Sequence, residues 1–178
     1  MQKKSYHQTC LNYEVICFDN ADHAGNCITR RSQTGILIFL NRAPIIRYSK
    51  AQNTIESSTF GAEFVATKMA VELMEGLRYK LRMFGIPIDG PVNTFVDNNS
   101  VMLNTTIPTS TLKKKRNSIA YHRVRELIAA GVIRIAKVSG KKNLADMLTK
   151  PLSANELINL DCKVLDFPSA YELNDNAN

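Results

Sequence analysis

Apolar residues follow a strand-like pattern in the first third of the chain. Three β-rich runs occur there, at residues 13–19, 35–41 and 42–50. The last two meet at a short segment with turn chemistry, residues 41–44, so we expect them to form an antiparallel hairpin. The chain is therefore predicted to open with three strands.

A helical period follows the three strands. Apolar residues now recur every three or four positions, at Ala62, Ala66, Met69, Leu73, Leu77, Leu81 and Phe84. This spacing predicts one long amphipathic helix, with N-cap candidates at 57–59 and an end at Gly85 and Pro87.

The remaining sequence alternates between the two patterns. Strands are expected at 92–97 and 132–138, and helices at about 98–104, at about 117–130 and at about 142–149. The resulting order is β-β-β-α-β-α-α-β-α, which predicts an α/β fold with a mixed five-stranded sheet and helices packed on it.

The same patterns suggest how the chain is divided. We expect a polar N-terminal stub at 1–12, one domain at 13–152, and a loose, partly disordered C-terminal tail at 153–178. No apolar run approaches the roughly 20 residues of a membrane-spanning helix, and the first residues lack an apolar signal core. An intracellular protein without a membrane partner is the expectation.

Positive charge is in excess. Lys and Arg number 23 against 16 Asp and Glu, which leaves a formal net charge of +7 and suggests a polyanionic partner. The densest basic run is Lys113, Lys114, Lys115 and Arg116, followed by Arg123 and Arg125. This run is either a solvated surface or a set of phosphate contacts, with a nuclear localisation signal as a weaker alternative.

Acidic residues stand where strands end and helices begin. Asp97 closes the fourth expected strand, Glu63 lies in the first turn of the long helix, and Asp146 lies in the first half of the last helix. Functional groups of open α/β sheets gather at the carboxyl ends of strands. Clustered carboxylates repel one another unless cations neutralise them, and carboxylate ligands suit Mg²⁺ or Mn²⁺. An acid of this kind taken alone is more often a turn residue or a helix cap.

Four motifs carry a resemblance to a known family: ESSTFGAEFVA, FVDNNSV, YHRVRE and NLADMLTKPL. They are similar, in the same order, to the S-S-T-E-A-E-Y, D-N-x-S, Y-H-x-x-R-E and A-D-x-x-T-K-P-L motifs of one domain. That domain is the ribonuclease H domain of copia-type LTR retrotransposon Pol polyproteins. The resemblance extends over about residues 13–152, including the second and third strands.

The resemblance implies the ribonuclease H fold and hydrolysis of the RNA strand of RNA-DNA hybrids during reverse transcription. It implies two Mg²⁺ (or Mn²⁺) ions held by four carboxylates, three of which match Glu63, Asp97 and Asp146. The implied partners are the hybrid and the reverse transcriptase domain of the same polyprotein, with no oligomeric state specified. The implied location is the cytoplasm, in a virus-like particle, or the nucleus.

The first of the four carboxylate positions departs from the family. The family reads D-A-[DNS]-[WY]-A where this chain reads NADHA, so Asn20 stands at the position of the first Asp. Asp19 and Asp22 are candidate substitutes, although Asp19 should face the opposite side of the strand and Asp22 lies further along it. Impaired cleavage is therefore expected. The alternative is a catalytically inactive ribonuclease H-like module that binds nucleic acid or is a structural remnant.

Overall fold

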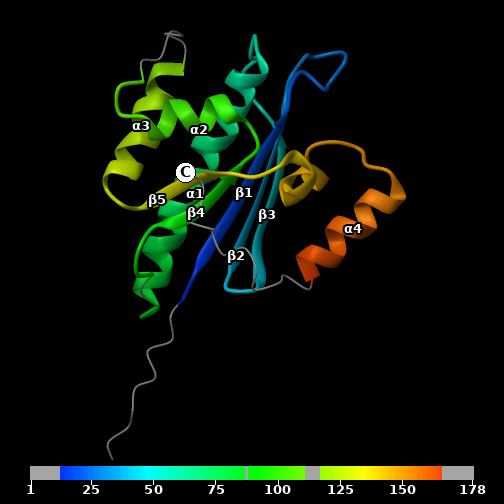
Figure 1. Cartoon of the computed structure of the whole chain (residues 1–178). Coiled ribbons are helices and arrows are strands. Elements are labelled where there is room, and N and C mark those ends of the chain that lie inside the picture. The colour runs from blue at the N-terminus through cyan, green and yellow to red at the C-terminus, as the bar shows by residue number, and fades with distance from the viewer. Residues whose placement is uncertain (1–12, 87, 111–116, 166–178) are drawn as a thin grey trace, which may run out of the picture.

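The computed structural model describes residues 13–86, 88–110 and 117–165, and within them five strands form one mixed sheet in the order β3-β2-β1-β4-β5 (Figure 1). The strands are β1 (Val15–Asp22), β2 (Gln33–Leu40), β3 (Ala43–Ala51), β4 (Val92–Val96) and β5 (Ile133–Lys137). The first three pair antiparallel, whereas β4 is parallel to both β1 and β5. The predicted fold class is confirmed.

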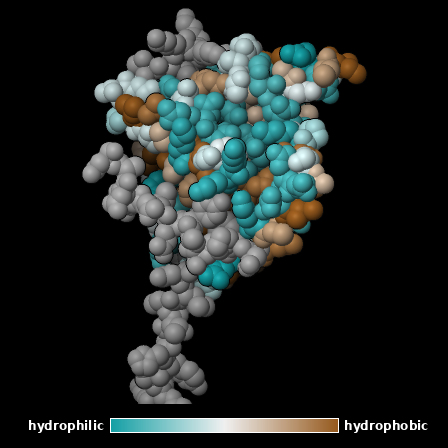
Figure 2. Space-filling model, turned by 45° about the vertical axis from the view of Figure 1, so that its right-hand side comes forward, coloured by the Kyte–Doolittle hydropathy of each residue, from teal (hydrophilic) through white to brown (hydrophobic). Residues whose placement is uncertain are grey.

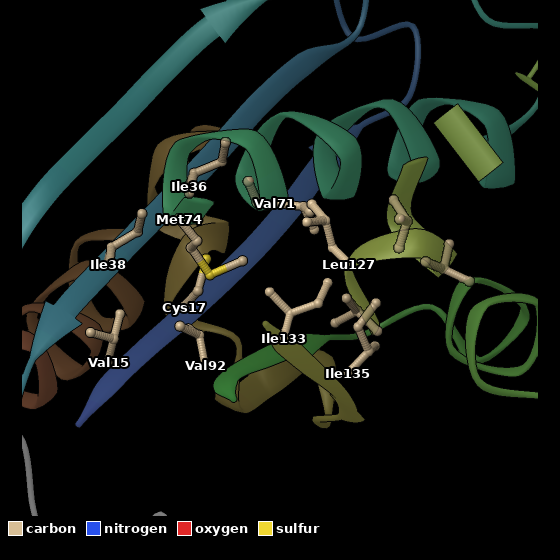
Figure 3. Packing of buried hydrophobic residues seen from close by; sticks show 14 of the residues in the cluster. Val15, Cys17, Ile36, Ile38, Val71, Met74, Val92, Leu127, Ile133 and Ile135 are labelled. Carbon is tan, nitrogen blue, oxygen red and sulfur yellow. The ribbon is translucent and has the colours of Figure 1, made fainter. Parts of the chain in front are cut away.

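Three helices cover one face of this sheet: α1 (Thr59–Met83), α2 (Asn99–Thr106) and α3 (Ser118–Ala129). Ser58 starts α1 by accepting a hydrogen bond from the Gly61 N–H. Apolar side chains of α1 and α3 pack on those of the strands, among them Cys17, Ile36, Val71, Met74 and Leu127 (Figure 3). No helix in the described part of the chain is long and apolar enough to cross a membrane.

The opposite face of the sheet is covered by segments from the end of the chain. These are the short 3₁₀ helices η2 (Gly140–Lys142) and η3 (Leu144–Leu148), and the helix α4 (Ala154–Leu165). Leu144 and Leu160 join the buried side chains of Phe18, Phe39 and Phe95 in a second apolar cluster. Both faces of β1 are therefore buried.

Two expectations about the end of the chain are corrected. Residues 142–149 do not form one α-helix, because Asn143 is extended and separates η2 from η3. Pro151 also disfavours helical geometry at Lys150. Residues 154–165 are not a loose tail, since α4 packs against η3 and β3. The expected stub at 1–12 and the rest of the tail, 166–178, lie outside the described residues.

Candidate functional site

The structure brings together the four positions that the resemblance singles out. Asn20 lies near the carboxyl end of β1 and Asp97 directly follows β4, and these strands are parallel neighbours. Glu63 of α1 accepts a hydrogen bond from the Ala21 N–H at 3.0 Å. Asp146 of η3 accepts one from the side chain of Asn20. The site is thus built by a helix on each face of the sheet and by the strand ends between them.

Asn20 is almost fully buried and uses its amide nitrogen as a donor. Its Nδ2 donates to the Asp146 carboxylate and, at 3.1 Å, to the hydroxyl of Thr149. A carboxylate can only accept hydrogen bonds, so the amide must turn its N–H groups, and not its oxygen, toward Asp146. At this point the site offers donor hydrogens where the family has a metal-binding oxygen.

Asp146 also has a cationic neighbour. The Lys150 ammonium lies 3.1 Å from its Oδ2, while Asn20 contacts Oδ1. The Asp146 side chain is only 15% exposed, whereas that of Lys150 is 44% exposed. Both carboxylate oxygens of Asp146 are therefore engaged by groups of the chain itself.

The position of η3 depends on two residues that no sequence motif indicates. Gly35 of β2 pairs in register with Asn20, and a Cβ at Gly35 would lie 2.8 Å from the Ala145 carbonyl and 2.6 Å from Thr149. The buried side chain of Asn143 donates to the Asp19 carbonyl at 2.8 Å and accepts from the Ala145 N–H at 3.1 Å. The lack of a side chain at Gly35 thus allows η3 to lie close to β2, and the amide of Asn143 connects η3 to β1.

Two carboxyl groups of the site have raised pKa values. Burial raises the pKa of Glu63 to about 9, with further contributions from the charges of Asp97 and Asp19, and the Ala21 N–H opposes the rise. Burial also raises the pKa of Asp97, and the charge of Asp146 adds to the rise, whereas Lys150 lowers it. Mutual repulsion of carboxylates in a partly buried place is what a bound cation would relieve.

Asp19 lies on the other side of β1, as the alternation of a strand predicts. Its side chain is fully buried, and neither its carboxylate oxygens nor the Thr67 hydroxyl has a partner in good hydrogen-bonding geometry among the described residues. Burial raises the pKa of Asp19 to about 8; the nearby Thr67 hydroxyl opposes this rise and the charge of Asp97 adds to it. Asp19 does not take the place of the missing carboxylate beside Asp146.

Asp22, the other candidate substitute, is the last residue of β1. Its carboxylate occupies the space that a Cβ on Gly25 would need, in the segment that connects β1 to β2. Substitution by Asp22 therefore stays a prediction.

The side chains of the site can be compared with the ligands that a divalent cation requires. Three carboxylates provide the right ligand chemistry. However, Asn20 and Lys150 already contact the two carboxylate oxygens of Asp146. In addition, no three Asp, Glu, His or Cys side chains of residues 13–86, 88–110 and 117–165 are arranged to hold one metal ion. In this arrangement the residues present do not fit a two-cation centre.

The predicted basic surface is only partly described. Lys113, Lys114, Lys115 and Arg116 lie outside the described residues. Arg123 pairs with Glu75 and Glu126. Arg125 donates to the carbonyls of Ile107 and Pro108 at 3.0 and 2.7 Å. The guanidinium of Arg125 therefore holds the turn after α2, a structural role that the sequence did not indicate.

Searches among known proteins identify relatives of this chain, although no family model matches it. It is 29% identical over 147 residues to a retrovirus-related Pol polyprotein from transposon RE1 of Arabidopsis thaliana, covering 83% of this chain. It is 29% identical over 139 residues to the Pol polyprotein from transposon TNT 1-94 of Nicotiana tabacum, covering 78% of this chain. The chain spans about 10% of the length of these relatives.

Solved structures share the fold at low sequence identity. LC11-RNase H1 in complex with an RNA/DNA hybrid superposes with a TM-score of 0.58 at 18% identity, over 82% of this chain and 97% of that one. A foamy viral protease-reverse transcriptase in complex with an RNA/DNA hybrid gives 0.56 at 17% identity, over 84% of this chain and 21% of that one. The chain is therefore related to the Pol polyproteins of copia-type retrotransposons and has the ribonuclease H fold.

Proposed function

We propose that this chain is the hybrid-processing domain of a retrotransposon Pol polyprotein and hydrolyses the RNA strand of RNA-DNA hybrids during reverse transcription, at a rate limited by Asn20. The reverse transcriptase domain of the same polyprotein is its proposed partner, inside the cell. Two Mg²⁺ or Mn²⁺ ions are the proposed cofactor of cleavage, and their site is incomplete in the natural chain.

One observation carries this proposal. Glu63, Asp97, Asp146 and Asn20 come from four separate elements and converge at one edge of the sheet. The structures with the same fold include two that hold an RNA/DNA hybrid. Convergence of three carboxylates at the place where parallel strands end is the arrangement expected for a catalytic site of an α/β sheet.

The residues of the chain have distinct tasks in this proposal. Glu63 is fixed by the Ala21 N–H and holds its carboxyl group against the end of β1. Asp97 is half-buried and faces Asp146, so these two would face the scissile phosphodiester. Asn20 donates a hydrogen bond to Asp146 and Lys150 forms an ion pair with it, and these two contacts lower its capacity to act as a ligand.

Hybrid cleavage by the natural chain and by Asn20→Asp tests the proposal. A hybrid with a labelled RNA strand is incubated with each protein in Mg²⁺ and in Mn²⁺. The natural chain is expected to cleave slowly and the variant on the order of tenfold faster or more, since even groups that only support a metal ligand contribute effects of this size. Asn41→Asp is the matched control, because it adds the same charge in the β2–β3 turn at the opposite edge of the sheet.

The outcomes separate the alternatives. Equal and robust cleavage by all three proteins would show that Asn20 does not limit the reaction. Hybrid binding without cleavage, even by Asn20→Asp, would favour an inactive nucleic-acid-binding module. A natural chain that neither binds nor cleaves the hybrid would overturn the proposed function.

A further inference from the structure

A pocket of about 590 Å³ opens beside the carboxylate site. Asp97 and Asp146 line it from the sheet side, and Lys141, Lys150 and Lys163 also line it. It is continuous with the candidate site, because those two acids belong to both. Figure 2 brings the α4 side of the molecule forward and shows hydrophilic side chains over much of its described surface.

The lysines of this pocket come from three separate segments. Lys141 belongs to η2, Lys150 follows η3, and Lys163 belongs to α4. The wall formed by α4 is fixed in place, because Leu160 and Val164 are buried in the cluster that includes Phe18 and Phe39 of the sheet. The lysines are thus held around one opening by the fold.

The charges of two of these lysines are not balanced within the structure. Lys150 is paired with Asp146, and Glu156, the other acid of the pocket, accepts hydrogen bonds from Ser153 at the start of α4. Lys141 and Lys163 are exposed and have no ion-pair partner among the described residues. Two free ammonium groups therefore face the pocket beside a site proposed to act on a phosphodiester.

We propose that this pocket receives backbone phosphates of the RNA strand next to the bond that lies against Asp97 and Asp146. This inference rests on the proposed function and adds the surface that holds the strand. A strand lying against the two acids must continue past them, and Lys141 and Lys163 offer the charge that its phosphates need on the α4 side. Lysines contact phosphates without reading bases, so this pocket adds affinity without sequence preference.

The two described arginines of the predicted basic run are engaged elsewhere, and the prediction for Lys113, Lys114, Lys115 and Arg116 stays untested. Arg125 is engaged with main-chain carbonyls and Arg123 with two glutamates. Lys141 and Lys163 are isolated in sequence, and only the packing of α4 brings them together. We assign to them the phosphate contacts nearest the carboxylates.

Binding of a defined RNA-DNA hybrid by the double variant Lys141→Gln/Lys163→Gln tests this. Binding is measured in a chelator of divalent cations, so that no cleavage occurs, over a series of salt concentrations. The dissociation constant is expected to rise on the order of tenfold at moderate salt. The slope of log affinity against log salt should fall in magnitude by about 1.8, as for the loss of two phosphate contacts on a duplex.

The matched control is Arg42→Gln/Lys80→Gln. It removes the same total charge from exposed positions in the β2–β3 turn and near the end of α1, away from the carboxylates. It is expected to bind like the natural chain, and melting temperatures of both double variants verify that they fold. Equal affinity and an equal salt slope for the pocket variant and the control would overturn this inference and leave the proposed function standing. Failure of the natural chain to bind the hybrid at all would overturn the proposed function and, with it, this inference.

Discussion

The side chain of Asn20 donates a hydrogen bond to the carboxylate of Asp146, although 126 residues separate the two in sequence. This bond joins the first strand of the sheet to a 3₁₀ helix near the end of the domain. It also places a neutral donor at a position where the related family has a carboxylate.

Replacing Asn20 by Asp should make the fold depend on cations. A carboxylate at position 20 would face Asp146 and repel it, at an expected cost of about 1 to 3 kcal/mol without divalent cations. The melting temperature of Asn20→Asp should therefore fall in a chelator, by about 2 to 4 °C per kcal/mol, and rise again with millimolar Mg²⁺. Thermal unfolding of both proteins with and without Mg²⁺ measures this. An equally large Mg²⁺-dependent rise in the natural protein would contradict the incomplete site.

Stability should decline as the pH rises from about 5 to 8, because the folded protein holds protons that the unfolded chain releases. The pKa of Asp19 is raised to about 8 in the folded state, so the folded protein binds one more proton than the unfolded chain in this range. The free energy of unfolding is then highest below the unfolded pKa of about 4 and falls by up to about 1.4 kcal/mol per pH unit.

The variant Asp19→Asn isolates the contribution of Asp19 to the pH dependence of stability from that of the other titrating groups. It removes the titration with almost no change of shape, so its unfolding free energy should decline less steeply with pH than that of the natural protein. Urea unfolding at pH 5.5 and 7.5 compares the two. Glu63 remains and titrates in the same direction, since its pKa is also raised, to about 9. Identical pH dependence in both proteins would show that Asp19 is not the protonated group.

Replacing Gly35 by Ala and replacing Gly76 by Ala should change the free energy of unfolding in opposite directions. At Gly35 a Cβ would lie 2.8 Å from the carbonyl of Ala145, so η3 must move away and the unfolding free energy should fall by about 1 to 3 kcal/mol. At Gly76, in the middle of α1, a Cβ meets nothing within 4 Å, and Ala should stabilise by about 0.5 to 1 kcal/mol. Denaturant unfolding of the two variants checks both signs. A neutral Gly35→Ala would mean that η3 is not held closely on the sheet.

Arg125→Lys should destabilise the protein without weakening hybrid binding. The guanidinium donates to two carbonyls of the turn after α2 and lies 5.0 Å from the Tyr121 ring, and a lysine cannot reproduce this planar set of donors. We expect a loss of about 1 to 3 kcal/mol in unfolding free energy. Hybrid affinity, measured well below the melting temperature, should change less than twofold. A selective loss of affinity with unchanged stability would return Arg125 to the nucleic-acid surface.

Much of the fold could be predicted because its local signals agree. The strands, the long helix and their order follow from apolar periodicity and from cap residues such as Ser58 and Gly85. The positions of Glu63, Asp97 and Asp146 were found because they stand at strand ends and helix starts, and because motif similarity supports them.

What could not be predicted depends on contacts between distant segments. Nothing in the sequence around Gly35 indicates that Ala145 packs on it, and the amide of Asn143 has its role only because the Asp19 carbonyl lies opposite. Residues 154–165 were expected to be loose, since α4 obtains its stability from burial of Leu160 and Val164 against the sheet.

The alternation of side chains along β1 has a consequence for how this site could be restored. Asp19 carries a carboxylate into a buried place where no group of the described residues other than the nearby Thr67 hydroxyl is positioned to donate to it, and Asn20 carries an amide to the place where a carboxylate would bind metal. The chain therefore has four acids at this strand end, but Asp19 lies on the α1 side of β1, opposite to Asn20 and Asp146. Exchanging the two neighbours, as Asp19→Asn with Asn20→Asp, would put the carboxylate on the Asp146 side of β1 and the amide on the α1 side. The composition and the net charge of the protein would not change.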